Sequence, residues 1–227
     1  MWFRWLAVPA CVHLLAGCST AGEIRDVPAS LVAIMSSNAP ATDLSASSFC
    51  AGVLTAADIV TTAAHCVADH DPERIDVQVS ADNLCSGAGI GGQRLHVTEV
   101  RVDPVLDLAE LVLEGPAEAT PARAADGREA SSLTAWGWGT GSIGGASPCE
   151  AAPKRLVVAE QSACEPADAA RYGDYLCALP LDGGANTCAG DSGGPVLDRK
   201  GRLVAITVAG VGCGPDDAGI YLRWPTS

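Results

Sequence analysis

The chain has 227 residues, a formal net charge of −13, 48% hydrophobic residues and only 18% charged residues. This length and apolar content suffice to bury a core and exclude a disordered chain. Because no cluster of Lys or Arg offers a footprint for phosphates, we expect no nucleic-acid partner.

The amino-terminal residues predict an export signal. Arg4 precedes an apolar run from Leu6 to Leu15, which is too short to span a bilayer comfortably. The run ends in Leu15-Ala16-Gly17-Cys18, which resembles the lipobox of bacterial lipoproteins. The alternative is an ordinary secretory signal that is cleaved near Gly17 or Ala21.

The lipobox resemblance implies a removed signal peptide, residues 1–17, followed by a lipidated Cys18 and a tether up to residue 26. A lipid at Cys18 would anchor the chain to a membrane without spanning it. We therefore expect an exported bacterial protein of the cell envelope, held at the outer membrane or facing the periplasm.

Short apolar runs separated by turn residues follow, and they predict an all-β domain over residues 27–227. A crossing near 114–130 divides the runs into two halves. The expected strands are Leu31–Met35, Gly52–Leu54, Asp58–Thr62, Ile75–Val79, Arg94–Val102, Leu108–Leu113, Ser132–Trp136, Lys154–Glu160, Tyr175–Leu179, Pro195–Leu197, Leu203–Val208 and Gly219–Arg223. A short helix is expected over Ala167–Tyr172. Many short strands with frequent turns favour a barrel or a sandwich.

The cysteines indicate an oxidising compartment. Of the ten, Cys11 and Cys18 belong to the export segment, which leaves an even set of eight. An even set in an exported chain is typical of disulfides. None of these eight forms a close pair of the kind that binds zinc, so we expect no metal site and no cofactor.

Three segments carry residues suited to nucleophilic catalysis, in the order Thr62–Cys66, Asp107–Ala109 and Gly190–Pro195. A serine hydroxyl needs a base to take its proton, a histidine can do so near neutral pH, and a buried carboxylate can fix the histidine tautomer. Asp103 directly precedes Pro104 and is typical of a turn, so Asp107 is the better candidate for that carboxylate.

These segments, which read TAAHC, DLAELVL and GDSGGP, resemble the trypsin/chymotrypsin family from about Val27 to Arg223. The resemblance implies two packed six-stranded antiparallel β-barrels and a serine endopeptidase that cleaves protein or peptide substrates through an acyl-enzyme. It implies His65, Asp107 and Ser192 as catalytic triad, with the backbone N–H groups of Gly190 and Ser192 as oxyanion hole.

The same resemblance implies the disulfides. Cys50–Cys66 would clamp the histidine loop, Cys188–Cys213 the walls of the specificity pocket and Cys164–Cys177 a loop of the second barrel. The pair Cys85–Cys149 follows by elimination.

Family spacing places the base of the specificity pocket at Asn186, with Thr187 beside it and Gly210 and Gly219 in its walls. Since Asn186 is uncharged where trypsin-like enzymes carry Asp, we expect cleavage after uncharged residues and not after Lys or Arg.

The sequence departs from the family in two places. The usual Ile-Val-Gly-Gly start is absent, so either a second cut frees Ile24 to pair with Asp191, or Asp191 finds another partner. Val208 and Ala209 stand where the family has Ser and Trp, although a one-residue shift would give Thr207 the role of the Ser. These departures motivate an alternative, in which the chain is a catalytically weak homologue that acts as an anchored binding module. An esterase on the same scaffold is a further possibility.

Overall fold

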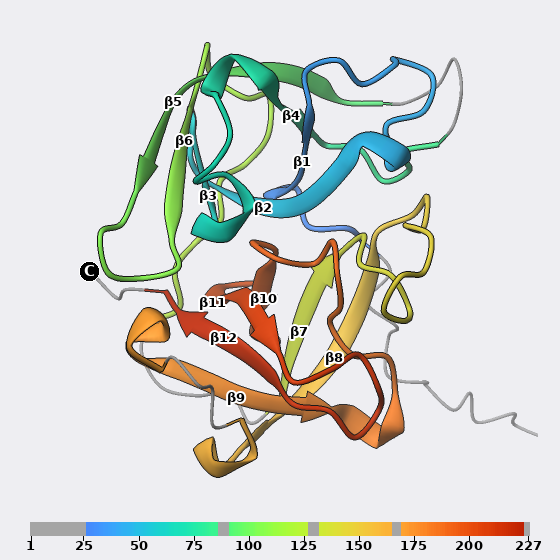
Figure 1. Cartoon of the computed structure of the whole chain (residues 1–227), viewed down its shortest axis with the longest axis vertical. Helices are drawn as coiled ribbons and strands as arrows, with labels where there is room; N and C mark the ends of the chain where they lie inside the picture. Colours follow the sequence, from blue (N-terminus) through green and yellow to red (C-terminus); the bar gives the residue numbers. More distant parts are fainter. Residues whose placement is uncertain (1–25, 86–90, 127–131, 165–168, 225–227) are drawn as a thin grey trace, which may run out of the picture.

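The computed structural model describes residues 26–85, 91–126, 132–164 and 169–224. Residues 1–17, Cys18, most of the 18–26 tether, Ile24 and part of the crossing near 114–130 therefore lie outside the described residues. The rest of the chain forms two closed β-barrels, one above the other in Figure 1.

The first barrel closes in the order β1-β2-β3-β6-β5-β4, with antiparallel pairing throughout. Its strands are β1 (Leu31–Ser36), β2 (Ser48–Ala56), β3 (Ile59–Thr62), β4 (Ile75–Val79), β5 (Gln93–Val102) and β6 (Ala109–Leu113). β6 shows why these segments become strands, because buried and half-buried residues alternate along it with period two.

The second barrel closes in the order β10-β11-β12-β9-β8-β7, also antiparallel. Its strands are β7 (Ser132–Gly137), β8 (Ala152–Ala159), β9 (Tyr175–Pro180), β10 (Pro195–Leu197), β11 (Leu203–Gly210) and β12 (Gly219–Arg223). The prediction of two six-stranded antiparallel barrels is confirmed.

The helical segments are short 3₁₀ turns: η1 (Ser45–Ser47), η2 (Ala64–Cys66), η3 (Pro72–Arg74), η5 (Gln161–Ala163), η6 (Ala169–Tyr172) and η7 (Leu181–Gly183). The helix expected over Ala167–Tyr172 appears as the 3₁₀ turn η6. The first two residues of the expected range lie outside the described residues. None of the described helical segments has the length and apolar character needed to cross a bilayer.

Apolar side chains from both barrels join the two halves. One cluster combines Leu31, Met35 and Val53 of the first barrel with Trp136 and Ile206 of the second, all of them buried. Burying such side chains from both barrels together stabilises their relative placement. The seam between the barrels is therefore part of the hydrophobic core.

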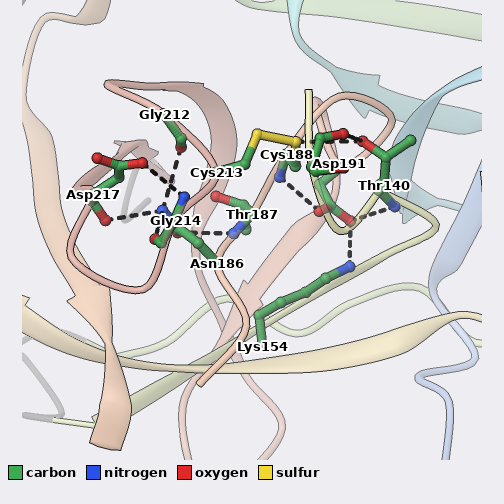
Figure 2. Close-up of a disulfide and its surroundings, with 12 residues drawn as sticks. Thr140, Lys154, Asn186, Thr187, Cys188, Asp191, Gly212, Cys213, Gly214 and Asp217 are labelled. Carbon is green, nitrogen blue, oxygen red and sulfur yellow. Dashed lines mark hydrogen bonds and ion pairs between the residues drawn. A yellow bond between two sulfur atoms is a disulfide. The ribbon is translucent and has the colours of Figure 1, made fainter. Parts of the chain in front are cut away.

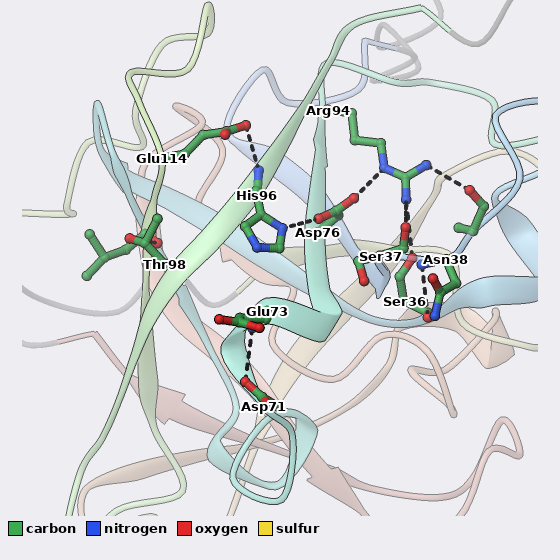
Figure 3. Close-up of polar contacts among 12 residues, drawn as sticks. Ser36, Ser37, Asn38, Asp71, Glu73, Asp76, Arg94, His96, Thr98 and Glu114 are labelled. Atoms are coloured by element: carbon green, nitrogen blue, oxygen red, sulfur yellow. Dashed lines mark hydrogen bonds and ion pairs between the residues drawn. The ribbon is translucent and has the colours of Figure 1, made fainter.

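A polar cluster fastens β4 and β5 to the loop that follows β1 (Figure 3). The buried Asp76 carboxylate accepts from Arg94 Nε at 2.6 Å and pairs with His96 Nδ1 at 2.8 Å. Arg94 also donates to the carbonyls of Ser36, Ser37 and Ala39. His96 is thus only partly exposed and holds a structural carboxylate.

Four disulfides join the cysteines of the described residues, and they are the four pairs expected: Cys50–Cys66, Cys85–Cys149, Cys164–Cys177 and Cys188–Cys213. Cys85–Cys149 joins the loop after β4 to the segment before β8, so it links the two barrels covalently.

Candidate active site

His65 and Asp107 meet at one end of the first barrel. β3 runs directly into η2, which carries His65, and Asp107 lies two residues before β6, the hydrogen-bonded neighbour of β3. His65 Nδ1 lies 2.8 Å from Asp107 Oδ2, and the His65 backbone N–H donates to Asp107 Oδ1 at 2.9 Å. The Asp107 side chain is 3% exposed and that of His65 40% exposed. The pair thus offers one imidazole edge to solvent and a buried carboxylate behind it.

The negative charge of Asp107 determines which ring nitrogen of His65 carries the proton. Burial pushes the Asp107 pKa upward, but the hydrogen bonds from the His65 ring and backbone, and the nearby charges of His65 and Arg171, outweigh it and lower the pKa overall. Asp107 is therefore an ionised, acceptor-only carboxylate. His65 must then carry its proton on Nδ1, which leaves the Nε2 lone pair free to act as a base.

Arg171, in η6, is a second partner of Asp107 that the sequence does not reveal. The Asp107 backbone N–H donates to the Arg171 carbonyl at 2.7 Å, and the Arg171 guanidinium lies 3.9 Å from Asp107 Oδ1. Val208 is buried in the apolar cluster that includes Ala109 and Leu111. The Thr207 hydroxyl is buried and has no hydrogen-bond partner among the described residues. Within the described residues, the ring and backbone N–H of His65 donate to the Asp107 carboxylate, and the Arg171 guanidinium lies nearby without a hydrogen bond to it.

Ser192 belongs to the second barrel but is held against the first. The Ala51 backbone N–H of β2 donates to the Ser192 carbonyl at 2.9 Å. The next residue, Gly193, has φ +81°, and a Cβ there would overlap Thr62 Oγ1 and the Ala51 carbonyl. Since Thr62 ends β3 and His65 follows three residues later, this contact brings the Ser192 segment to the histidine loop.

The turn before Ser192 presents two backbone donors. Gly190 has φ +97°, a conformation that disfavours side chains, and the Asp191 N–H donates to the Cys188 carbonyl at 2.9 Å. Within the described part of the chain, the N–H groups of Gly190 and Ser192 donate to no protein acceptor. Two free N–H groups beside a serine can receive a developing oxyanion.

Asp191, between these two donors, is fully buried and is paired with Lys154 (Figure 2). Lys154 Nζ lies 2.6 Å from Asp191 Oδ1, which also accepts from the Gly139 N–H at 2.9 Å. The other oxygen, Oδ2, accepts from the Cys188 N–H at 2.9 Å. A Cβ on Gly137 or Gly139 would overlap this carboxylate, so the two glycines of the Trp136–Gly139 segment make room for it.

The Lys154–Asp191 pair gives Asp191 a charged partner other than a freed amine, which is one of the two alternatives that the sequence leaves open. A signal for it exists in the sequence. Lys154 shares the inward face of β8 with Leu156, whereas Arg155 between them is exposed. A lysine at a core-facing strand position is rarely buried without a charged partner.

A cavity of about 250 Å³ opens beside Ser192. Its lining residues carry no charged side chain; they are Ile143, Thr187, Cys188, Ala189, Ser192, Thr207, Ala209, Gly210, Val211, Gly212 and Cys213. Of the expected pocket residues, Thr187 and Gly210 thus line it, and Asn186 and Gly219 do not. A Cβ on Gly219 would overlap the hydroxyl of the buried Tyr221, which pairs with the Thr187 hydroxyl at 3.0 Å.

Asn186 is buried and holds the neighbouring loop. Its amide donates to the carbonyls of Gly212 and Gly214 at 3.4 Å and of Asp217 at 2.8 Å, and its oxygen accepts from the Thr187 N–H at 2.8 Å. The side chain is therefore fully engaged with the backbone around the cavity.

Cys50, His65 and Cys66 cluster closely enough to suggest a metal site. The two sulfurs are joined in a disulfide, so they offer no thiolate to an ion.

Comparisons with known proteins place the chain among trypsin-like relatives. The family model described as Trypsin matches residues 27–226. A trypsin from Saccharopolyspora erythraea is 33% identical over 193 residues, covering 77% of this chain and 82% of its own length. A vitellin-degrading protease from Bombyx mori is 33% identical over 196 residues, covering 77% and 71%. The solved structure of neuropsin, a serine protease of mouse brain, superposes with a TM-score of 0.70 at 24% identity, over 87% of this chain and 92% of its own, and supports the fold.

Proposed function

The chain belongs to the trypsin family, and we propose that it is a serine endopeptidase in which Ser192 is the nucleophile, His65 the base and Asp107 the residue that orients His65. The observation that carries the proposal is the His65–Asp107 pair, in which Nδ1 lies 2.8 Å from the buried carboxylate. The pair lies on the side of the first barrel that contacts the Ser192 segment.

The reaction begins when Ser192 Oγ attacks the carbonyl carbon of the scissile bond and gives its proton to His65 Nε2. The carbonyl oxygen becomes an oxyanion that accepts from the N–H groups of Gly190 and Ser192. His65 then gives the proton to the leaving amine, the C–N bond breaks, and an acyl ester remains on Ser192.

Water completes the cycle. It gives a proton to His65 and attacks the ester carbon, and the same two N–H groups receive the second oxyanion. The bond to Ser192 Oγ breaks, His65 returns the proton to that oxygen, and the acid product leaves. The donors and the base serve both halves of the reaction, and no cofactor enters.

The cavity beside Ser192 supports cleavage after an uncharged residue of medium or large size. Its lining is uncharged, and the exposed Ile143 and Val211 extend it with apolar surface. A Lys or Arg side chain placed there would lose hydration without meeting a carboxylate. We therefore propose turnover of Leu, Met or Phe anilides ahead of the Arg anilide. Faster turnover of the Arg anilide would contradict this specificity.

Four disulfides indicate an oxidising compartment, so the protein is exported. The lipid on Cys18 is a finer proposal. Mass spectrometry of the mature amino terminus would detect a diacylglyceryl cysteine, and a start at another residue would refute it.

The proposed activity is tested with a fluorophosphonate probe on the exported chain, beside the Ser192→Ala variant. The probe forms a bond from phosphorus to Ser192 Oγ and expels fluoride, and it does so only where the serine is activated. Labelling of the wild type alone, together with cleavage of peptide anilides, supports the endopeptidase. Turnover of esters without anilides would favour an esterase. A folded wild type that takes no label would favour the anchored binding module.

A further inference from the structure

The Lys154 ammonium is buried beside the turn that carries the two proposed oxyanion donors. The Lys154 side chain is 5% exposed and that of Asp191 is 0% exposed, and their charged atoms lie 2.6 Å apart. Lys154 Nζ also donates to the Gly137 carbonyl at 3.2 Å. An ammonium in such surroundings is tolerated only when it is paired and hydrogen-bonded, and both conditions are met.

Asp191 fixes the backbone on both of its sides. Its carboxylate binds the Cys188 N–H, three residues upstream, and the Gly139 N–H from the loop after β7. Its carbonyl accepts from the Gly194 N–H at 2.9 Å. The two N–H groups proposed as oxyanion donors belong to its immediate neighbours, Gly190 and Ser192. Whatever holds the Asp191 side chain therefore sets the direction of both donors.

We propose that Lys154 is the residue that positions the oxyanion hole, and that the protein needs no freed amino terminus to become active. This inference rests on the proposed endopeptidase function. Lys154 Nζ and the N–H groups of Gly139 and Cys188 together donate to both carboxylate oxygens of Asp191. The Asp191 side chain has no exposed surface left for a further amine. Activation by cleavage before Ile24 is thereby unnecessary.

The test compares the exported full chain with Lys154→Met, which keeps an unbranched side chain of nearly the same length and removes its charge. Arg155→Met is the matched control, because Arg155 is the exposed neighbour on β8. Fluorophosphonate titration counts the reactive sites, and kcat and KM are then measured per site with one peptide anilide. We expect Lys154→Met to lower kcat by about 100-fold or more with KM changed by less than about threefold, as for the loss of an oxyanion donor. Arg155→Met keeps wild-type values.

The kinetic constants measured per reactive site distinguish a positioning role of Lys154 from a role in folding alone. A residue that only supports the fold would lower the number of titratable sites and leave kcat per site unchanged, and this result would overturn the proposal. So would wild-type kinetics in Lys154→Met, while the proposed peptidase function would stand. If the wild type itself neither reacts with the probe nor cleaves peptides, the proposed function is refuted, and the inference with it.

Removing one partner leaves a buried carboxylate unpaired, which destabilises a protein strongly. The double variant Lys154→Met/Asp191→Asn lacks both charges and therefore accompanies the single variant. We expect it to fold, by circular dichroism and a thiol count, and to react as slowly as the single variant. Wild-type rates in the folded double variant would overturn the proposal.

Amino-terminal sequencing of the fraction labelled by the probe tests the second half of the inference. We expect labelled wild-type molecules to begin at the mature export site, upstream of Ile24. Labelling confined to molecules that begin at Ile24 or Val27 would overturn it.

Discussion

Replacing Asp107 by Asn would test the proposed triad most directly, because it changes hydrogen-bonding character without changing shape. Oδ1 accepts from the His65 backbone N–H at 2.9 Å, and Oδ2 lies 2.8 Å from Nδ1. A backbone N–H can only donate, so the amide oxygen of Asn must take the Oδ1 position. The amide NH₂ then faces Nδ1 and forces it to accept, which moves the ring proton to Nε2.

A proton on Nε2 prevents His65 from taking the proton of Ser192. The same change in a serine-protease triad lowers kcat by about 10⁴-fold, which corresponds to about 5 kcal/mol of barrier. We expect a loss of this size in kcat for a peptide anilide and in the rate of fluorophosphonate labelling. KM should change little, since the cavity beside Ser192 does not include Asp107.

Asp103→Asn is the matched control, because Asp103 lies in the same loop and its Oδ1 accepts from the N–H groups of Val105 and Leu106. An amide oxygen can replace that acceptor, so activity should stay near the wild-type value. If Asp107→Asn loses less than about tenfold in kcat while remaining folded, Asp107 does not set the tautomer of His65, and the proposed mechanism is wrong.

Three further predictions concern acid stability, the orphaned hydroxyl and the loop beside the cavity. Because hydrogen bonds from His65 hold the Asp107 pKa below its ordinary value despite burial, its ionised form stabilises the fold above about pH 4. This stabilisation disappears as the pH falls through the lowered pKa, so urea unfolding should show the wild type losing its advantage over Asp107→Asn at acid pH; an advantage that stays constant down to pH 2 would contradict this. Thr207→Val removes a buried hydroxyl that has no partner among the described residues, so the free energy of unfolding should stay level or rise by about 1 kcal/mol, with activity within a few-fold of wild type; a clear fall in the free energy of unfolding would contradict this. Asn186→Asp would turn a carboxylate toward the carbonyls of Gly212, Gly214 and Asp217, so it should lower the thermal midpoint without creating activity on Arg anilides, and rapid cleavage of such an anilide would refute this account of the loop.

The strands and the three motifs could be predicted because their signals are local. Along β6, the alternation of buried and half-buried residues corresponds to a pattern in consecutive residues of the sequence. The residues around His65 and Ser192 likewise lie in short continuous segments, and the disulfide pairs followed from the family resemblance.

His65 was predicted as a partner of Asp107, but the further contacts of Asp107 and Asp191 could not be predicted, because they come from distant segments. Lys154 is separated from Asp191 by 37 positions, and the Arg171 carbonyl accepts from the backbone N–H of Asp107, a contact that no side-chain pattern encodes. Spacing also placed Asn186 near the pocket without telling which way its amide points. That direction depends on the carbonyls of a loop that approaches only in the folded chain.

The Lys154–Asp191 pair has a consequence for the control of a protease. A peptidase that awaits a cut at its amino terminus can be stored inert and switched on irreversibly by another enzyme. Under our proposal that Lys154 positions the oxyanion hole, this chain needs no such cut, and folding becomes the step that controls activity. Cys188–Cys213 closes the segment in which Asp191 lies, and disulfides persist only outside a reducing cytosol. We therefore expect proteolytic activity to appear first when the disulfides form after export. Later control of that activity would depend on inhibitors or on the supply of accessible substrate.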